Sequence, residues 1–220
     1  MKRMIALLLA LTLAATVLSL SACSKGGNTQ ATGGEAAAQT ETVNLNELTP
    51  YALGSDGKPT SYYKNEYDDQ KRLTRNYTYD LNGKLMSSTG YEYDENGNEI
   101  RDIMYNADGE ITAQILWEKT ADGKVTKQSE VDSKGVVTKS VTYEYTDSGL
   151  ESVVSEYDSS GKLVKYRKFE YDEDDNLVKE ELYDGDDELQ SYITYVDHED
   201  GGYTAYKYDG EGNLISKEDY

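Results

Sequence analysis

A tandem repeat constrains this chain more than any other feature. The phrase Tyr-x-Tyr-Asp, followed by two residues, a Gly and a nearby apolar residue, occurs at 77–85 and again at 91–100. Together the two phrases fill a unit of 26 residues, 73–98, which recurs without a gap at 99–124, 125–150, 151–176 and 177–202. A weaker copy occupies 47–72 and a shortened one 203–220. A fixed period with two turns per unit is typical of repeat arrays.

The turns follow the same period. Their centres alternate at intervals of 14 and 12 residues, and Gly212 then comes one residue early. The centres are Gly57, Lys71, Gly83, Gly97, Gly109, Gly123, Gly135, Gly149, Gly161, Asp175, Asp187 and Gly201. Most turns begin with Asp, which suits the first position of a type I turn, and Gly then suits the left-handed position that follows. We expect bulged hairpins, with positive φ at Gly83, Gly97, Gly109, Gly123, Gly135 and Gly161.

The segments between turns have the length and composition of β-strands. They span about seven to nine residues and are rich in Tyr, Val, Ile and Thr. An α-helix needs about ten or more residues at a 3.6-residue period, and no segment offers them. The sequence therefore predicts an all-β domain over 44–220, an antiparallel meander of about thirteen strands. So long a sheet should twist and curl into a single curled sheet, with a closed barrel as the alternative.

The N-terminus has the pattern of an export signal. Lys2 and Arg3 precede an apolar run over 5–20, so 1–22 is predicted to be a signal peptide. The segment Leu20-Ser21-Ala22-Cys23 resembles the lipobox of bacterial lipoproteins. This resemblance implies cleavage before Cys23, a diacylglycerol on its sulfur, and export to the bacterial cell envelope as a lipid-anchored protein. The alternatives are an ordinary signal peptide with an incidental Cys23, and a transmembrane helix, for which the apolar run is short.

Composition indicates a tether before the sheet and limits the kinds of partner that the protein can bind. Residues 23–43 are mostly Gly, Ala, Thr and Gln after the cysteine and are predicted to form a flexible tether. The formal net charge of −20 makes nucleic acid an unlikely partner. Cys23 is the only cysteine, so the sheet has no disulfide. The chain contains 21 Tyr, one Phe and one Trp, and tyrosine suits a thin sheet because its hydroxyl can stay in water.

Turn geometry also predicts side-chain pairing. The residue before the turn Asp should lie opposite the second residue after Gly, which gives Tyr79–Leu85, Tyr105–Ile111, Val131–Val137, Tyr157–Leu163 and Tyr183–Leu189. We place these pairs on one apolar face together with Tyr91, Trp117, Tyr143, Phe169 and Tyr195. The opposite face would be polar, with Glu92, Glu118, Glu144, Glu170, Thr78, Ser88, Ser140 and Thr142. The same geometry at the second turn of each unit predicts the pairs Tyr91–Arg101, Trp117–Lys127, Tyr143–Val153 and Phe169–Lys179.

The repeat resembles the YD repeat of Rhs-type proteins. The resemblance is carried by 77–85, 91–100, 157–163 and 208–214 and covers about 47–220. It implies a β-ribbon that winds into a shell, in that family sometimes around a toxin. This chain is far shorter than a full shell requires, and we see no effector region after the repeats. We therefore do not expect toxin delivery.

Candidate chemistry is sparse. His198 is the only histidine and falls in a predicted turn without a nucleophile beside it, so we expect no catalytic residues and no enzyme activity. Clustered carboxylates make weak Ca²⁺ candidates of Asp172, Asp174, Asp175, Asp184, Asp186 and Asp187. Solvated hairpin tips are the plainer interpretation, and no other cofactor is expected.

The aromatic residues Tyr91, Trp117, Tyr143, Phe169 and Tyr195 have two interpretations, a buried sheet core or an exposed surface on which a ligand stacks. The function expected from the sequence is a non-catalytic surface lipoprotein that binds an extracellular protein or polysaccharide. The alternative is a structural or spacer protein without a ligand.

Overall fold

A computed structural model describes residues 43–199 and 201–220. The predicted signal peptide, Cys23 and nearly all of the tether lie outside the described residues. A short 3₁₀ helix, η1 (Leu45–Glu47), precedes fourteen strands. These are β1 (Thr49–Leu53), β2 (Pro59–Tyr67), β3 (Leu73–Tyr79), β4 (Leu85–Tyr93), β5 (Glu99–Asn106), β6 (Ile111–Lys119), β7 (Val125–Asp132), β8 (Val137–Tyr145), β9 (Glu151–Asp158), β10 (Leu163–Tyr171), β11 (Leu177–Asp184), β12 (Leu189–Asp197), β13 (Tyr203–Asp209) and β14 (Leu214–Asp219).

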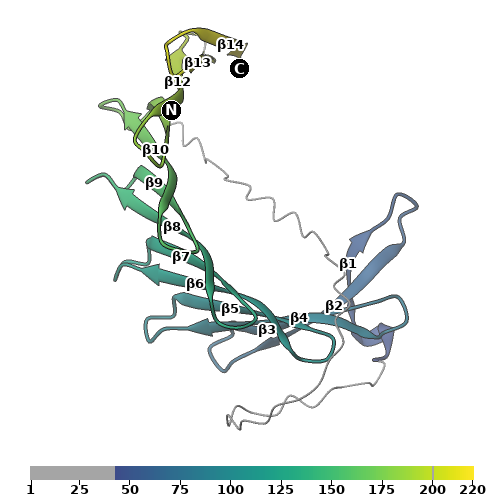
Figure 1. Cartoon of the computed structure of the whole chain (residues 1–220). Coiled ribbons are helices and arrows are strands. Elements are labelled where there is room, and N and C mark those ends of the chain that lie inside the picture. The colour runs from purple at the N-terminus through teal and green to yellow at the C-terminus, as the bar shows by residue number, and fades with distance from the viewer. Residues whose placement is uncertain (1–42, 200) are drawn as a thin grey trace, which may run out of the picture.

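The strands form one antiparallel meander in which each pairs with its neighbours in sequence. The sheet curls into an open arc, with β1 at one end and β14 at the other (Figure 1). The predicted single curled all-β sheet is confirmed, with fourteen strands instead of about thirteen, and the closed-barrel alternative is wrong. No helix in the described part of the chain is long and apolar enough to span a membrane.

The predicted turns are confirmed. The backbone has positive φ at all of the predicted turn centres, including Lys71, Asp175 and Asp187, where no glycine is present. In the turn after β3, Gly83 N donates to Asp80 O at 3.1 Å and Asp80 N to Lys84 O at 2.9 Å. Asp80 Oδ1 accepts the N–H groups of Asn82 and Lys84 at 2.8 and 2.9 Å. The carboxylate therefore closes the turn, and these bonds hold the pKa of Asp80 below its usual value.

The register is confirmed at the first turn of each unit and wrong at the second. All five predicted pairs from Tyr79–Leu85 to Tyr183–Leu189 are present. Trp117, however, pairs with Gln128, while Lys127 pairs with Glu118. The four predicted pairs at the second turns, from Tyr91–Arg101 to Phe169–Lys179, are all displaced by one residue in this way.

A β-bulge explains the displacement. After almost every turn, the outgoing strand carries one extra residue that the partner strand does not match. After the turn that follows β4, Tyr93 pairs with Glu99 as the turn geometry predicts, but Glu92 pairs with Arg101 and leaves Ile100 unmatched. A bulge reverses the alternation of side chains between the two faces beyond it.

The predicted division into an apolar and a polar face is therefore wrong. Tyr77 and Tyr79 share a face, and Ser88 lies on that face too because it pairs directly with Tyr77. Glu92, four residues after Ser88 on the same strand, also lies on the face that bears Tyr79. The rings of Tyr91, Trp117, Tyr143, Phe169 and Tyr195 lie on the other face, with Thr78. We call the face that bears these five rings the column face. Each face of the sheet mixes apolar and polar side chains.

The apolar core is small. Val141, Val154 and Phe169 form a buried cluster on the column face, and Tyr143, Tyr171 and Leu177 pack against it. No described side chain is less than 2 % exposed. Extensive contacts join only consecutive strands, so the described part of the chain supplies no second layer over either face. Stability must therefore come mainly from contacts between neighbouring strands, as in other repeat proteins.

Candidate functional site

The five rings of the column face recur on alternate strands, β4, β6, β8, β10 and β12. Each lies close to the sheet edge formed by the turns at 68–72, 94–98, 120–124, 146–150, 172–176 and 198–202, which we call the column edge. Because the rings are two strands apart, successive rings are separated by about 10 Å across the sheet.

Burial divides the rings into two kinds. Phe169 is only 6 % exposed and belongs to the core cluster, whereas Tyr91, Trp117, Tyr143 and Tyr195 are half-buried. Desolvation raises the pKa of Tyr91 and Tyr143, and it raises that of Tyr195 to about 12. The column is therefore partly sheet core and partly a surface that a ligand can reach.

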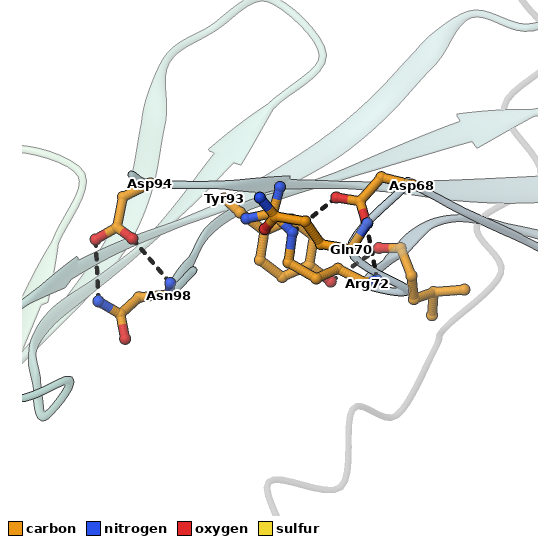
Figure 2. A network of polar contacts seen from close by, with 7 residues as sticks. Asp68, Gln70, Arg72, Tyr93, Asp94 and Asn98 are labelled. Atoms are coloured by element: carbon orange, nitrogen blue, oxygen red, sulfur yellow. Dashed lines mark hydrogen bonds and ion pairs between the residues drawn. The ribbon is translucent and has the colours of Figure 1, made fainter. Parts of the chain in front are cut away.

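Tyrosines at the ends of the strands fasten neighbouring hairpins together at the column edge. Tyr93, Tyr145 and Tyr171 each donate their hydroxyl to a backbone carbonyl 20 residues earlier, at 2.8, 2.6 and 2.9 Å. We call this contact the tyrosine latch. In the latch of Figure 2, the guanidinium of Arg72 lies 4.7 Å from the centroid of the Tyr93 ring.

The two turns in Figure 2 show how this edge is ordered. Arg72 is held by Asp68, with 2.7 Å between Nε and Oδ2. In the next turn along the edge, Asp94 accepts both the backbone N–H and the side-chain amide of Asn98, at 2.8 and 3.0 Å. The pattern places a basic side chain over a ring beside an ordered carboxylate.

Not every unit has this tyrosine, and unit 99–124 departs from the pattern in the middle of the array. In 99–124, Lys119 replaces the latch tyrosine, and its Nζ lies 5.9 Å from the centroid of the Trp117 ring. Asp102 pairs directly with Tyr91, and desolvation together with the nearby Glu99 raises the pKa of Asp102 to about 6. We call Tyr91, Glu99, Asp102, Trp117 and Lys119 the Trp117 cluster.

The Trp117 cluster contains the two unsatisfied buried side-chain atoms found among the described residues, Asp102 Oδ1 and Trp117 Nε1. The indole N–H lies near enough to lower the pKa of Asp102, but the two groups lack normal hydrogen-bond geometry. Unsatisfied polar atoms of this kind are rare in native proteins and need a reason.

Analysis of the sequence singled out Trp117 but missed Glu99 and Asp102. A comparison of the units does not single out Asp102, because the corresponding positions hold Asn76, Gln128, Val154 and Glu180, and Glu180 is acidic as well. Lys119 is a visible departure, because its counterparts in three other units are Tyr93, Tyr145 and Tyr171, although Asp197 departs as well.

The weak Ca²⁺ candidates are not brought together. Asp172, Asp174 and Asp175 belong to the turn before β11, whereas Asp184, Asp186 and Asp187 belong to the turn after it. Asp172 Oδ1 and Asp184 Oδ1 each accept two backbone N–H groups of their own turns. Among the described residues, no group of three or more His, Cys, Asp or Glu side chains is placed to hold a metal ion.

His198 takes part in a partly buried hydrogen-bond chain. Its Nε2 lies 2.7 Å from Thr204 Oγ1, and that hydroxyl donates to Asp219 Oδ1 at 2.6 Å. Thr204 is 2 % exposed. Because the hydroxyl proton is directed to Asp219, His198 acts as the donor to Thr204 and does not activate it as a nucleophile. The chain ties β14 to the turn after β12.

Comparisons with known proteins identify no family. No protein-family model matches the chain, and no curated protein matches it. A solved porin-like protein from Bacteroides uniformis is 16% identical over 67% of this chain and 54% of its own, with a TM-score of 0.33. The Photorhabdus luminescens Tc holotoxin pore is 15% identical over 78% of this chain and 11% of its own, with a TM-score of 0.30.

An accessory secretory protein structure from Streptococcus pneumoniae gives 14% identity and a TM-score of 0.25, over 66% of this chain and 23% of its own. The chain thus spans about half the length of the porin-like protein and much less of the other two. Similarity at this level is compatible with a β-rich fold and carries no information on activity.

Proposed function

We propose that the protein is a non-catalytic, lipid-anchored protein of the bacterial cell envelope that binds an extracellular protein or polysaccharide through its column face. The observation that carries this proposal is the recurrence of half-buried rings on a sheet face over which the described part of the chain places no second layer. Aromatic rings offer large contact areas at low entropic cost, and contiguous apolar patches on a surface often mark binding sites.

The absence of catalysis is part of the proposal. Support comes from His198, whose ring is engaged by Thr204, and from the carboxylates of the turns, which accept backbone N–H groups. The one strongly raised carboxyl pKa, that of Asp102, belongs to a cluster without a nucleophile. His198 and the turn carboxylates stabilise the sheet and its turns, and we infer that the activity of the surface is binding.

Envelope fractions and glycan arrays test the binding. Retention of a protein or glycan should fall when Trp117 is replaced by Ala, because the ring offers the widest stacking surface of the column. Leu116→Ala is the matched control, since Leu116 is the preceding residue, lies on the opposite face and is 36 % exposed. If neither a protein nor a glycan is retained, the protein is a spacer without a ligand. If Trp117→Ala and Leu116→Ala retain the protein or glycan equally well, the binding site lies elsewhere.

The anchor has its own test. Cys23→Ser removes the sulfur that the lipobox resemblance implies is lipidated, so the variant should leave the membrane fraction and lose its lipid label. Partition into the membrane as in the wild type would overturn the anchor while leaving the binding proposal intact.

A further inference from the structure

The column face holds two places where a ring and a carboxylate meet without an ion pair to the carboxylate. The first consists of Tyr91, Glu99 and Asp102. Asp102 pairs directly with Tyr91, and burial together with Asp102 and Glu99 raises the pKa of Tyr91. The second consists of Tyr143 and Glu151. Glu151 pairs with Tyr145, which lies two residues from Tyr143 on the same face, and burial together with Glu151 raises the pKa of Tyr143. We call them the first and second acid–ring sites. They are related by two repeat units, or four strand spacings, so they lie about 19 Å apart across the sheet.

The carboxylates of both sites are half-buried and short of positive charge. Among the described residues, ion pairs join Lys or Arg to Glu92, Glu118, Glu156, Glu170, Glu180 and Glu181, but none involves Glu99, Asp102 or Glu151. Lys119 and Arg167 lie near enough to act on Asp102 and Glu151 without forming an ion pair. A half-buried carboxylate in this state gains most from a cation that a ligand brings.

The column edge itself shows how such a cation is received. Arg72 lies over Tyr93 at 4.7 Å, Lys119 over Trp117 at 5.9 Å and Lys124 over Tyr145 at 5.4 Å, each measured to the ring centroid. A lysine or arginine can place its methylenes on the ring and its charge at the carboxylate. Among the described residues, no lysine or arginine lies over the ring of Tyr91 or Tyr143, and both rings have acidic neighbours.

The net charge of the protein and the distance between the two acid–ring sites indicate which kind of ligand fits. A protein with a formal net charge of −20 repels anionic polymers, so nucleic acids and acidic polysaccharides are excluded as partners of this face. In a polyproline II segment, two turns advance about 19 Å in six residues, and a fully extended segment covers nearly the same distance in six. Basic residues about six positions apart would therefore reach both sites at once. Polyproline II segments also dock on aromatic surfaces without needing backbone partners.

We propose that the ligand is an extended polypeptide segment that crosses β4–β9 on the column face and places two basic side chains in the acid–ring sites. This inference rests on the proposed binding function and specifies its partner. Trp117 on β6 lies between the two sites and contacts the middle of the segment.

Intrinsic fluorescence provides the assay, because Trp117 is the only tryptophan of the chain. The probe is a proline-rich peptide with two lysines about six residues apart, as two polyproline II turns require. Its controls are the same peptide with glutamine in place of lysine, and one with the lysines about three residues apart. The first peptide should change Trp117 fluorescence at the lowest concentration, and added salt should weaken its binding.

Variants of the chain locate the contact. Combining Glu99→Gln with Glu151→Gln should weaken binding of the two-lysine peptide about tenfold, since each lost contact between a lysine and a carboxylate is worth a few-fold. Glu144→Gln is the control, because Glu144 follows Tyr143 directly, is exposed and points to the opposite face. Circular dichroism of each variant establishes that the sheet is intact.

The outcomes separate this inference from the function on which it rests. If the glutamine peptide binds as well as the lysine peptide, or if the double variant binds as the wild type does, the acid–ring sites are not its contacts and the inference is wrong. Binding of a neutral glycan that depends on Trp117 but not on Glu99 and Glu151 would also overturn it, yet would support the proposed function. Absence of any ligand at Trp117 would overturn both.

Discussion

Two regions of the sheet occupy the same positions of the repeat and differ in how their side chains are packed. The Trp117 cluster lies around β4–β6, and the core cluster lies two units later around β8–β10. The corresponding residues are Tyr91 and Tyr143, Glu99 and Glu151, Asp102 and Val154, Trp117 and Phe169, and Lys119 and Tyr171. The later region buries Val154 and Phe169 to 7% and 6% exposure, whereas the earlier one holds polar atoms without hydrogen bonds.

The difference shows that the repeat backbone does not need a buried cluster in every unit. Consecutive strands are joined by backbone hydrogen bonds throughout, and the latch and the turn carboxylates recur on both sides of the Trp117 cluster. In repeat proteins, stability accumulates from contacts between neighbouring units, so one unit can lose some without unfolding. Places where a protein departs from its own structural rule are often functional, and the Trp117 cluster is such a place.

The largest loss of stability is expected when the core cluster is made to resemble the Trp117 cluster. Val154→Asp inserts a carboxylate among Val141 and Phe169, and Arg167, directly opposite, is already engaged by Glu180 at 3.4 Å. The free energy of unfolding should fall by about 3 kcal/mol, because a buried unpaired charge replaces a packed side chain. Urea denaturation of the chain measures it.

The control for this change is Val164→Asp, since Val164 is 48% exposed on the same sheet. That variant should lose less than about 0.5 kcal/mol, as surface substitutions usually do. Equal losses at Val154 and Val164 would mean that the core cluster contributes nothing beyond the surrounding sheet.

The converse change removes the buried carboxyl of the Trp117 cluster. The pKa of Asp102 rises from about 3.8 in the unfolded chain to about 6 in the fold, so the folded state binds the proton more tightly. The contribution of Asp102 to the free energy of unfolding is therefore greatest below about pH 4. It declines between about pH 4 and 6 and is lost above that range. Asp102→Asn should match the wild type in acid and exceed it at pH 7.

The expected gain at pH 7 is about 1 kcal/mol. The full shift corresponds to about 3 kcal/mol, and solvent screening at a half-buried group reduces it. Denaturation at a series of pH values measures the gain, with Asp108→Asn, in an exposed turn, as control. A stability difference that does not change between pH 4 and 7 would show that Asp102 does not titrate in this range.

Much of this fold can be predicted from the sequence, because its rules are local. A turn needs a residue such as Asp80 to accept backbone N–H groups and a residue such as Gly83 to take positive φ, and both are visible in a single unit. Such signals recur often enough to predict the strand order and the turn centres at Lys71 and Asp175, where the backbone has positive φ.

The assignment of faces failed because it depends on a residue that has no sequence signal. The bulges at Met86 and Ile100 leave their turns unchanged, yet each exchanges the faces of the side chains that follow it on its strand. Asp102 was missed for a related reason, since its burial depends on pairing with Tyr91 across the bulge at Ile100. Periodicity predicts which residues alternate, whereas a bulge decides which face they reach.

A smaller effect on stability is expected at the position of the missing tyrosine latch. Lys119→Tyr restores the repeat residue, and its hydroxyl should reach the carbonyl of Glu99 as Tyr145 reaches that of Val125 at 2.6 Å. The variant should be more stable by about 0.5–1 kcal/mol, the usual net value of one hydrogen bond. Lys119→Phe supplies the ring without the hydroxyl, and thermal unfolding of both variants isolates the hydrogen bond. Identical midpoints for the two would show that no latch forms.

The smallest effect concerns the turns that follow the two regions. Gly123 after β6 corresponds to Asp175 after β10, and both have positive φ, at 88° and 65°. The left-handed conformation costs a residue with a Cβ about 1 kcal/mol, although Asp tolerates it better than most. Asp175→Gly should therefore stabilise the chain by only about 0.5 kcal/mol, since glycine also loses more entropy on folding.

The reverse change, Gly123→Asp, should cost more than Asp175→Gly gains, because a Cβ at Gly123 would lie 3.1 Å from Asn98 Oδ1. The internal control is Asp174→Gly, at the preceding position of the same turn, where φ is not positive and glycine should destabilise. Thermal unfolding of the three variants orders them. If Asp175→Gly and Asp174→Gly shift the midpoint in the same direction, backbone strain is not what distinguishes the two turns, and the difference must come from the side chains that the neighbouring strands present to them.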